Sequence, residues 1–228
     1  MTTVVFDLGG VVVLWDPVPA VAAVVGEERA ERFVRGGDFD FDAWNHAQDA
    51  GRSFDEGEAA AAVSHPHLAD EIGAYRANFA RSLRGLVPGT AEILRGLQDR
   101  GVRLVALTNW SAETIHHLHE AHPEVVALFD DVVVSGVEGV AKPDPRIFEV
   151  LADRLGQPLD GLFYVDDGGR NVEAARRAGM DAVRFTDAAA LRAELAARGL
   201  LQPLLHRDAR RGPDGRCGGT CRAARLVP

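Results

Sequence analysis

The most distinctive residue of the chain is Lys142, the only lysine among its 25 lysines and arginines. An ammonium is a compact point charge, whereas a guanidinium is a planar fork, so the two are not interchangeable at a crowded site. Lys142 also lies in the proline-stiffened stretch Ala141-Lys142-Pro143-Asp144-Pro145. We therefore interpret Lys142 as a functional cation rather than as an arbitrary surface charge.

Other polar side chains follow apolar segments that have the composition of buried strands. Asp7 comes directly after Val4-Val5-Phe6, Thr108 and Asn109 follow Leu107, and Asp166 and Asp167 follow Leu162-Phe163-Tyr164-Val165. Ligands of open parallel sheets bind beyond the carboxyl ends of the strands. We therefore expect these five side chains and Lys142 to gather at one rim of a sheet.

The chemistry of such a rim is set by its charges. Three carboxylates held close together repel one another, and a hard divalent cation with oxygen ligands, Mg²⁺, relieves that repulsion. Once the ion is bound, a carboxylate, a hydroxyl and an ammonium around an open position suit a phosphoryl group, whose oxygens need cationic and hydrogen-bonding partners. Asp7 could then attack phosphorus directly and form an aspartyl-phosphate.

The segments that must position these residues alternate between short apolar strands and helical stretches. This alternation predicts an α/β fold in which a doubly wound parallel sheet of five or six strands is covered by helices on both faces. The predicted strands span residues 4–6, 102–107, 132–134, 162–165 and 182–185.

Residues 17–84 interrupt this rhythm. They are rich in Ala, Glu and Asp, carry Trp44 and several phenylalanines at helix-like intervals, and contain no convincing strand. We predict a helical insertion that follows the first strand and whose aromatic residues form a small core of their own. The sheet domain would then consist of residues 1–16 and 85–202.

Composition and charge restrict the classes of protein. The net charge of -9 combines a basic tail, residues 203–228, with a strongly acidic body, which argues against nonspecific nucleic-acid binding. No apolar run reaches the length of a membrane span, and the N-terminus lacks a leader pattern, so we predict a cytoplasmic protein without membrane contact. Both cysteines, Cys217 and Cys221, fall in the tail, which we predict to be disordered. Nothing in the sequence indicates an oligomeric state.

Four stretches of the chain carry the chemical residues together with their neighbours. They are Val5-Phe6-Asp7-Leu8-Gly9-Gly10-Val11, Leu107-Thr108-Asn109-Trp110-Ser111, Ala141-Lys142-Pro143-Asp144-Pro145 and Tyr164-Val165-Asp166-Asp167 with Arg170-Asn171-Val172-Glu173-Ala174-Ala175. In this order they resemble the four motifs of the haloacid dehalogenase-like (HAD) hydrolase superfamily, and the resemblance covers residues 4 to about 201. Within the superfamily, the chain is similar to the phosphatase-like branch with a small helical (C1-type) cap, which includes bacterial sugar-1-phosphate phosphatases.

The resemblance implies a role for each chemical residue around the substrate. Asp7 would be the nucleophile, Thr108 and Asn109 would hold the transferring phosphoryl group, and Lys142 would neutralise both Asp7 and that group. The enzyme would be a phosphatase, a hydrolase acting on a small phosphorylated metabolite, for example a sugar phosphate.

The resemblance also implies a metal site and a lid. Asp7, Asp166 and Asp167 would hold Mg²⁺ directly or through water, and the backbone carbonyl of Gly9 would be a further ligand. The core would be Rossmann-like, and the helical insertion would close over the substrate.

Gly9 departs from the pattern. Most HAD phosphatases carry a second aspartate there, which protonates the leaving group and later activates water; a positioned general acid contributes about 10²- to 10⁴-fold. One hypothesis is a substrate whose leaving group scarcely needs a proton, such as an anomeric sugar phosphate or an acyl phosphate. The other is an acid supplied by the insertion, for which His46, His65 and His67 are candidates.

Other functions stay open on the sequence alone. A 2-haloacid dehalogenase uses an aspartate nucleophile against carbon, but it has no need for the acidic pair Asp166 and Asp167. A receiver domain would place its paired acids before the nucleophile, which is the opposite of the order here. Because of Gly9, a catalytically weak protein that binds a phosphorylated ligand is a third alternative.

Overall fold

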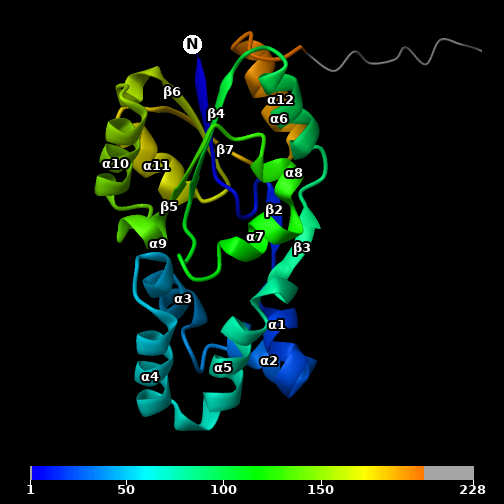
Figure 1. The fold of residues 1–228 in the computed structure, drawn as a ribbon, viewed down its shortest axis with the longest axis vertical. Helices are drawn as coiled ribbons and strands as arrows, with labels where there is room; N and C mark the ends of the chain where they lie inside the picture. Colours follow the sequence, from blue (N-terminus) through cyan, green and yellow to red (C-terminus); the bar gives the residue numbers. More distant parts are fainter. Residues whose placement is uncertain (1, 203–228) are drawn as a thin grey trace, which may run out of the picture.

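A five-stranded parallel sheet forms the centre of the structure, with strand order β5-β4-β1-β6-β7 (Figure 1). The structure is a computed structural model that describes residues 2–202. The tail 203–228, with the predictions made for it and its two cysteines, lies outside the described residues. The strands are β1 (Thr3–Phe6), β4 (Arg103–Thr108), β5 (Asp131–Val134), β6 (Leu162–Asp166) and β7 (Asp181–Arg184).

Helices cover both faces of this sheet because alternate strand residues point to opposite sides. Val4 and Phe6 belong to one apolar core, whereas Val5 belongs to a second core on the other face. The predicted doubly wound α/β fold is confirmed, with five strands. On the first face lie α6 (Thr90–Gln98), α7 (His116–Ala121), α8 (Pro123–Val126) and α12 (Ala188–Ala197); on the second lie α9 (Ser135–Glu138), α10 (Pro145–Leu155) and α11 (Gly169–Arg177).

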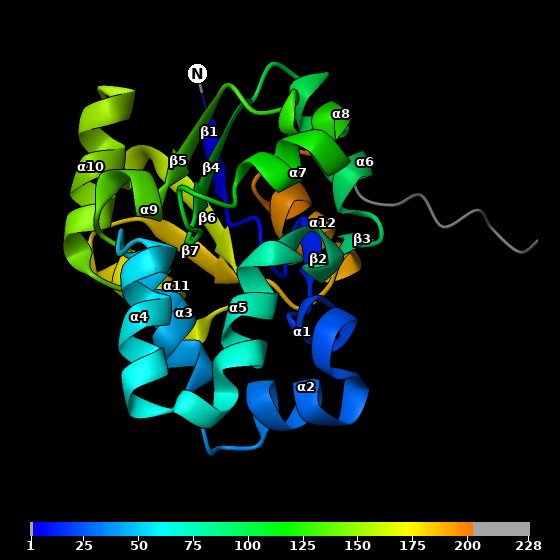
Figure 2. The same cartoon turned by 60° about the horizontal axis from the view of Figure 1, so that its bottom comes forward.

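Five further helices form a separate group beyond the carboxyl ends of the strands, at the bottom of Figure 1 and turned forward in Figure 2. Their aromatic side chains pack on one another, with Tyr75 in contact with Phe41, Trp44 and Phe54. We call this group, residues 17–84, the helical insertion. Its helices are α1 (Val18–Val25), α2 (Glu27–Arg35), α3 (Phe41–Asp49), α4 (Phe54–Ser64) and α5 (Ala69–Ala77), with 3₁₀ turns at Pro66–Leu68 and Phe79–Ser82.

Two short antiparallel strands, β2 (Val13–Trp15) and β3 (Leu83–Leu86), join the insertion to the sheet domain. Sequence reasoning missed this pair. Each strand has only three or four residues, and β3 contains Gly85, a poor strand former, so neither gives a clear alternating pattern. Their pairing fixes where the chain leaves the sheet domain and where it returns.

Local signals explain where several helices begin. Asp144 accepts a hydrogen bond from the Arg146 amide and Pro145 is the first helical residue of α10, an N-cap arrangement that holds the loop containing Lys142. In the insertion, Ser53 and Glu56 form a capping box at the start of α4. Among the described residues, no helix has the length and apolar composition needed to cross a membrane.

Candidate active site

Three neighbouring strands bring the polar residues to one rim. Asp7 follows β1 directly, and its amide continues the ladder by donating to the Val165 carbonyl at 2.8 Å. Thr108 is the last residue of β4, and Asp166 is the last residue of β6. Because β4, β1 and β6 are adjacent and parallel, their carboxyl ends meet at the middle of the sheet.

Lys142 holds this rim together. Its ammonium lies 2.7 Å from Asp166 Oδ2, 3.0 Å from Asp7 Oδ1 and 2.8 Å from the Leu107 carbonyl oxygen, so three acceptors use its three N–H donors. The side chain is only 1% exposed. A planar guanidinium cannot direct three donors from a single nitrogen, which gives a physical reason for the sole lysine of the chain.

The charge on Lys142 is secured by its neighbours. Burial disfavours the ammonium, but the carboxylates of Asp7 and Asp166 outweigh that effect, and the pKa of Lys142 is raised above its ordinary value. The group is therefore a fixed positive charge at the centre of the site.

Asn109 positions the loop that carries Lys142. Its amide nitrogen donates to the Lys142 carbonyl at 2.8 Å, and its amide oxygen accepts from the Lys142 N–H at 2.8 Å. The side-chain amide of Asn109 is therefore engaged with the backbone. A contact between Asn109 and phosphate would come from its backbone N–H.

Thr108, the other predicted phosphate ligand, is buried, and its hydroxyl has no hydrogen-bond partner within residues 2–202. A buried hydroxyl without a partner costs free energy, so it is a group for which a ligand oxygen would be a favourable partner. Thr108 does not itself line the pocket described below.

Asp166 is the most heavily bonded carboxylate of the site. Besides Lys142, it accepts from the Gly168 amide at 2.7 Å, from Asn171 Nδ2 at 3.1 Å and from the Tyr164 hydroxyl. It is fully buried. Asp166 therefore anchors Lys142 as well as contributing negative charge.

The acidic cluster has the composition of a Mg²⁺ site. Asp7, Asp166 and Asp167 each present one carboxylate oxygen, and these three oxygens lie within 4.8 Å of one another. Burial raises the pKa of Asp7 to about 7 although Lys142 opposes the shift, and the charges of Asp166 and Asp167 add to it. Three carboxylates against one ammonium leave two negative charges, which a divalent cation with oxygen ligands would balance. The donor set therefore fits the predicted Mg²⁺.

Gly10 makes room for this cluster. Its φ is +75°, and a Cβ atom there would lie 2.3 Å from Asp167 Oδ2. Only glycine combines that backbone conformation with the close approach of a carboxylate. Gly9, by contrast, would meet no atom within 4 Å if it carried a Cβ.

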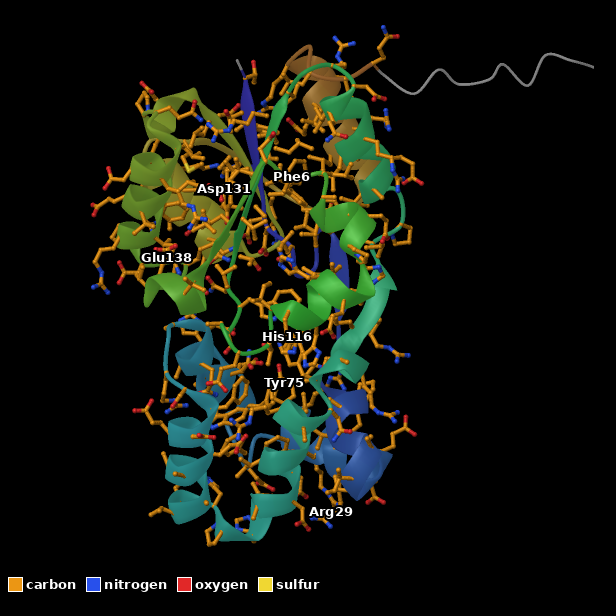
Figure 3. All side chains as sticks on the ribbon, in the orientation of Figure 1. Phe6, Arg29, Tyr75, His116, Asp131 and Glu138 are labelled. Atoms are coloured by element: carbon orange, nitrogen blue, oxygen red, sulfur yellow. The ribbon has the colours of Figure 1, made fainter. Side chains whose placement is uncertain are left out.

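The rim opens into a pocket of about 280 Å³ that lies between the sheet domain and the helical insertion. Asp7, Gly9, Asn109, Lys142 and Asp167 line it from the sheet domain. Tyr75, labelled in Figure 3 where the insertion meets the sheet domain, lines it from α5. The remaining lining residues are Gly10, Trp15, Asn45, Asp49, Phe79, Trp110 and Asn171.

The insertion contributes residues that sequence reasoning missed. Asn45 and Asp49 on α3 line the pocket, whereas none of the three predicted histidines does. His46 and His67 are exposed, and His65 packs against the ring of Phe39. The structure therefore does not support these three candidates as the source of the proton. The histidines were suggested by the chemistry of imidazole, which does not indicate where a side chain lies. The one sequence feature that could have suggested Asp49 is its spacing of four residues from Asn45, which places both side chains on one face of a helix.

Comparison with known proteins agrees with this architecture. The family model described as haloacid dehalogenase-like hydrolase matches residues 1–179. A sesquiterpene phosphatase, astK of Aspergillus oryzae, is 28% identical over 204 residues, which span 84% of this chain and 93% of that protein. A glyceraldehyde 3-phosphate phosphatase of Methanopyrus kandleri is 34% identical over 103 residues, which span 43% and 42% of the two chains. The fold is similar to that of the magnesium complex of the HAD family enzyme bt-2542 from Bacteroides thetaiotaomicron, with a TM-score of 0.64, 18% identity, and coverage of 82% of this chain and 94% of that one.

The fold and the rim of acids around one lysine define a hydrolase of the α/β class. The chain belongs to the haloacid dehalogenase-like hydrolase family. Its relatives include several phosphatases, which supports a phosphatase function.

Proposed function

We propose that the protein is a Mg²⁺-dependent phosphatase that hydrolyses a small phosphorylated metabolite through an aspartyl-phosphate on Asp7. The observation that carries this proposal is the contact of one buried ammonium, Lys142, with both Asp7 and Asp166, in a site where Lys142 and Asp7 line a pocket. A carboxylate can attack an anionic phosphoryl group only where positive charge offsets the repulsion between them.

The residues have the following parts in this mechanism. Asp7 Oδ attacks phosphorus, and its other oxygen stays near Lys142, whose charge stabilises the phosphoryl oxygens as the bond forms. Thr108 and the Asn109 backbone would hold those oxygens. Asp7, Asp166, Asp167 and the Gly9 carbonyl would hold Mg²⁺ directly or through water, and the bound ion would add Lewis-acid stabilisation of the phosphoryl group.

The pocket supports a small substrate. A volume of about 280 Å³ accommodates a phosphoryl group and a modest alcohol. Trp110 and Tyr75 offer flat apolar faces, and Asn45 and Asn171 offer amides for hydroxyl groups. A sugar phosphate matches this mixture of faces and amides and is our first candidate. The named substrates of the phosphatase relatives range from a sesquiterpene to glyceraldehyde 3-phosphate, so a substrate panel needs both polar and apolar alcohols.

The test is a phosphate-release screen over sugar phosphates, nucleotides, prenyl phosphates and acyl phosphates, run with Mg²⁺ and with EDTA. We expect steady-state turnover that needs the metal and disappears in Asp7→Asn. Turnover that persists in EDTA would contradict the parts given to Asp166 and Asp167, and full turnover by Asp7→Asn would refute the nucleophile.

Two controls address the alternatives. Metal-independent chloride release from 2-chloropropionate would indicate a dehalogenase. A protein that binds phosphate but gives no steady-state release from p-nitrophenyl phosphate would be a phospho-ligand binding protein.

A further inference from the structure

We propose that Asp49, the last residue of α3 in the helical insertion, is the general acid and base of this active site and replaces the carboxylate that Gly9 lacks. This inference rests on the proposed phosphatase function and names the residue that exchanges protons with the leaving group and with water.

Asp49 shares a pocket with the nucleophile although the two residues come from different parts of the fold. It lines the same cavity as Asp7 and Lys142. Helix α3 packs against α9, at the carboxyl end of strand β5. The end of α3 is therefore directed at the rim where the reacting phosphoryl group would lie.

The backbone of Asp49 is fixed to that rim. The Ser135 hydroxyl donates to the Asp49 carbonyl oxygen at 2.5 Å and accepts from the Trp110 amide at 3.0 Å. Ser135 is fully buried at the end of β5, and Trp110 follows β4. This bridge ties the last residue of α3 to the ends of two strands of the sheet.

Glycines allow the close approach that follows Asp49. Gly51 has φ of +104°, and a Cβ atom there would lie 2.9 Å from the Gly139 Cα atom. Within the sheet domain, a Cβ on Gly136 would lie 2.7 Å from the Trp110 carbonyl oxygen, so α9 also packs closely against the chain that follows β4. A side chain at position 51 would push the insertion away from the rim, so the sequence is suited to holding Asp49 in place.

The surroundings of the Asp49 carboxyl favour its protonated form. Burial raises its pKa to about 7, and this effect outweighs the Ser111 amide and the charge of Lys142, which lower it. Asn45 Nδ2 donates to Asp49 Oδ2 at 3.1 Å. The ionisable groups that face Asp49 are Lys142 and Tyr75, and burial raises the pKa of Tyr75 well above its ordinary value, so its phenol stays neutral. A carboxyl in this state can both donate and recover a proton near neutral pH.

Elimination leads to the same residue. Asp7, Asp49, Tyr75, Lys142 and Asp167 are the ionisable residues that line the pocket within the described part of the chain. Asp7 is the nucleophile, Asp167 belongs to the acidic cluster, and Lys142 is a fixed cation. The phenol of Tyr75 is too weak an acid. Asp49 is the lining carboxyl that has no other function in the mechanism.

The proton transfers balance over the two half-reactions. As Asp7 Oδ bonds to phosphorus, the bond from phosphorus to the leaving oxygen breaks, and that oxygen takes the electron pair and the proton of the Asp49 carboxyl, releasing an alcohol. Ionised Asp49 then removes a proton from water, whose oxygen attacks phosphorus. The bond between phosphorus and Asp7 breaks, which releases inorganic phosphate and restores both aspartates to their starting states.

The test compares leaving groups in the wild type, Asp49→Asn and Asp42→Asn. Asp42 is an exposed aspartate on the same helix that does not line this pocket, so it is a matched control. One substrate is p-nitrophenyl phosphate, whose leaving group is a stable anion. The other is the alkyl phosphate that the wild type hydrolyses fastest.

For Asp49→Asn we expect kcat/KM, which reports the steps up to release of the leaving group, to fall by about 10²- to 10⁴-fold on the alkyl phosphate and by less than about tenfold on p-nitrophenyl phosphate, because only the alkoxide needs a proton. The attack of water on the aspartyl-phosphate also loses its base, so kcat should fall on both substrates. Asp42→Asn should match the wild type on both. An equal loss of kcat/KM on both substrates, or no loss on either, would overturn the assignment of Asp49.

A measurement on the wild type alone keeps the proposal testable if Asp49→Asn does not fold. kcat/KM on the alkyl phosphate should decline at alkaline pH as Asp49 loses its proton, whereas kcat/KM on p-nitrophenyl phosphate should decline less. Parallel pH profiles for the two substrates would contradict a proton donor. A wild type without steady-state release would instead refute the proposed function, so the two failures are distinguishable.

Discussion

The rim of the sheet and the helical insertion face the same pocket, but they hold their ionisable groups by opposite means. At the rim, the ammonium of Lys142 lies between two carboxylates and a carbonyl oxygen, so its charge is stabilised by direct contacts. In the insertion, the Asp49 carboxyl has no ion pair within the described residues, and burial is the main cause of its raised pKa. One region thus holds a fixed positive charge, and the other holds a carboxyl whose surroundings favour its protonated form.

Removing Lys142 should have the largest effect on stability. Lys142→Met would leave Asp7 and Asp166 buried without their cation, and breaking a buried pair in this way costs about 3–5 kcal/mol. Urea unfolding should show this loss, together with loss of turnover. The matched control is Arg146→Met, which removes an exposed partner of Asp144 and should change stability little. Similar losses in the two variants would mean that the rim does not depend on this ammonium.

Cutting the bridge between the two regions should have a smaller effect. Ser135→Ala would leave the Asp49 carbonyl and the Trp110 amide without their partner, which costs about 1–3 kcal/mol when the groups stay buried. Because Asp49 would then be held less firmly, kcat/KM on an alkyl phosphate should fall more than kcat/KM on p-nitrophenyl phosphate. Ser64→Ala, at the far end of α4, is the control. An unchanged ratio of the two rates would show that Ser135 does not position Asp49.

The pH dependence of stability should distinguish Asp49 from an ordinary surface acid. Its pKa is raised in the folded state from 3.8 to about 7. Between about pH 4 and pH 7 the unfolded chain loses this proton while the folded state keeps it, so the free energy of unfolding decreases as the pH rises through this range. Asp49→Asn removes this penalty. In EDTA, the Tm of the variant relative to wild type should therefore be higher by a few degrees at pH 8 than at pH 5.

The same comparison with Asp42→Asn should show no such trend, because that carboxyl is exposed. The raised pKa of Asp7 affects wild type and both variants alike and cancels in the difference. A Tm difference between Asp49→Asn and wild type that stays constant from pH 5 to pH 8 would contradict a protonated Asp49.

A second-site substitution gives the smallest expected effect. Position 9 has open space for a side chain. Gly9→Asp in the Asp49→Asn background should therefore raise the rate on an alkyl phosphate roughly tenfold above that of Asp49→Asn alone, which is a fraction of what a well-positioned general acid contributes. Gly9→Asn in the same background is the matched control, since an amide cannot donate a proton in this way. Equal rates for the two double variants would argue that a carboxyl at position 9 does not reach the leaving oxygen.

Local patterns in the sequence were enough to predict the sheet and much of the rim. The five parallel strands lie within a residue or two of their predicted bounds, because continuous apolar runs are readable without knowledge of their neighbours. Asp7, Asp166 and Asp167 come together because acids at the ends of adjacent parallel strands must meet. The roles assigned to these residues stay predictions until turnover is measured.

Other features of the site were not readable in this way. The part that Asn109 has in positioning the loop of Lys142 is one of them, because its side-chain amide pairs with the backbone of a residue 33 positions away. The β2–β3 pair was missed because its strands are short and pair only with each other. Asp49 is one of 34 acidic residues, and nothing in its immediate sequence sets it apart.

The sequence by itself determined the family, the parallel sheet and the single lysine that a crowded cationic position requires, because each of these depends on residue type and on order along the chain. The tertiary structure alone decided which carboxyl of the insertion reaches the pocket. The Asp49 carbonyl is fixed by a serine 86 residues away, and its proton affinity is set by burial between two parts of the fold. Burial and contacts between distant segments exist only once the insertion has packed against the rim, so no local pattern encodes them.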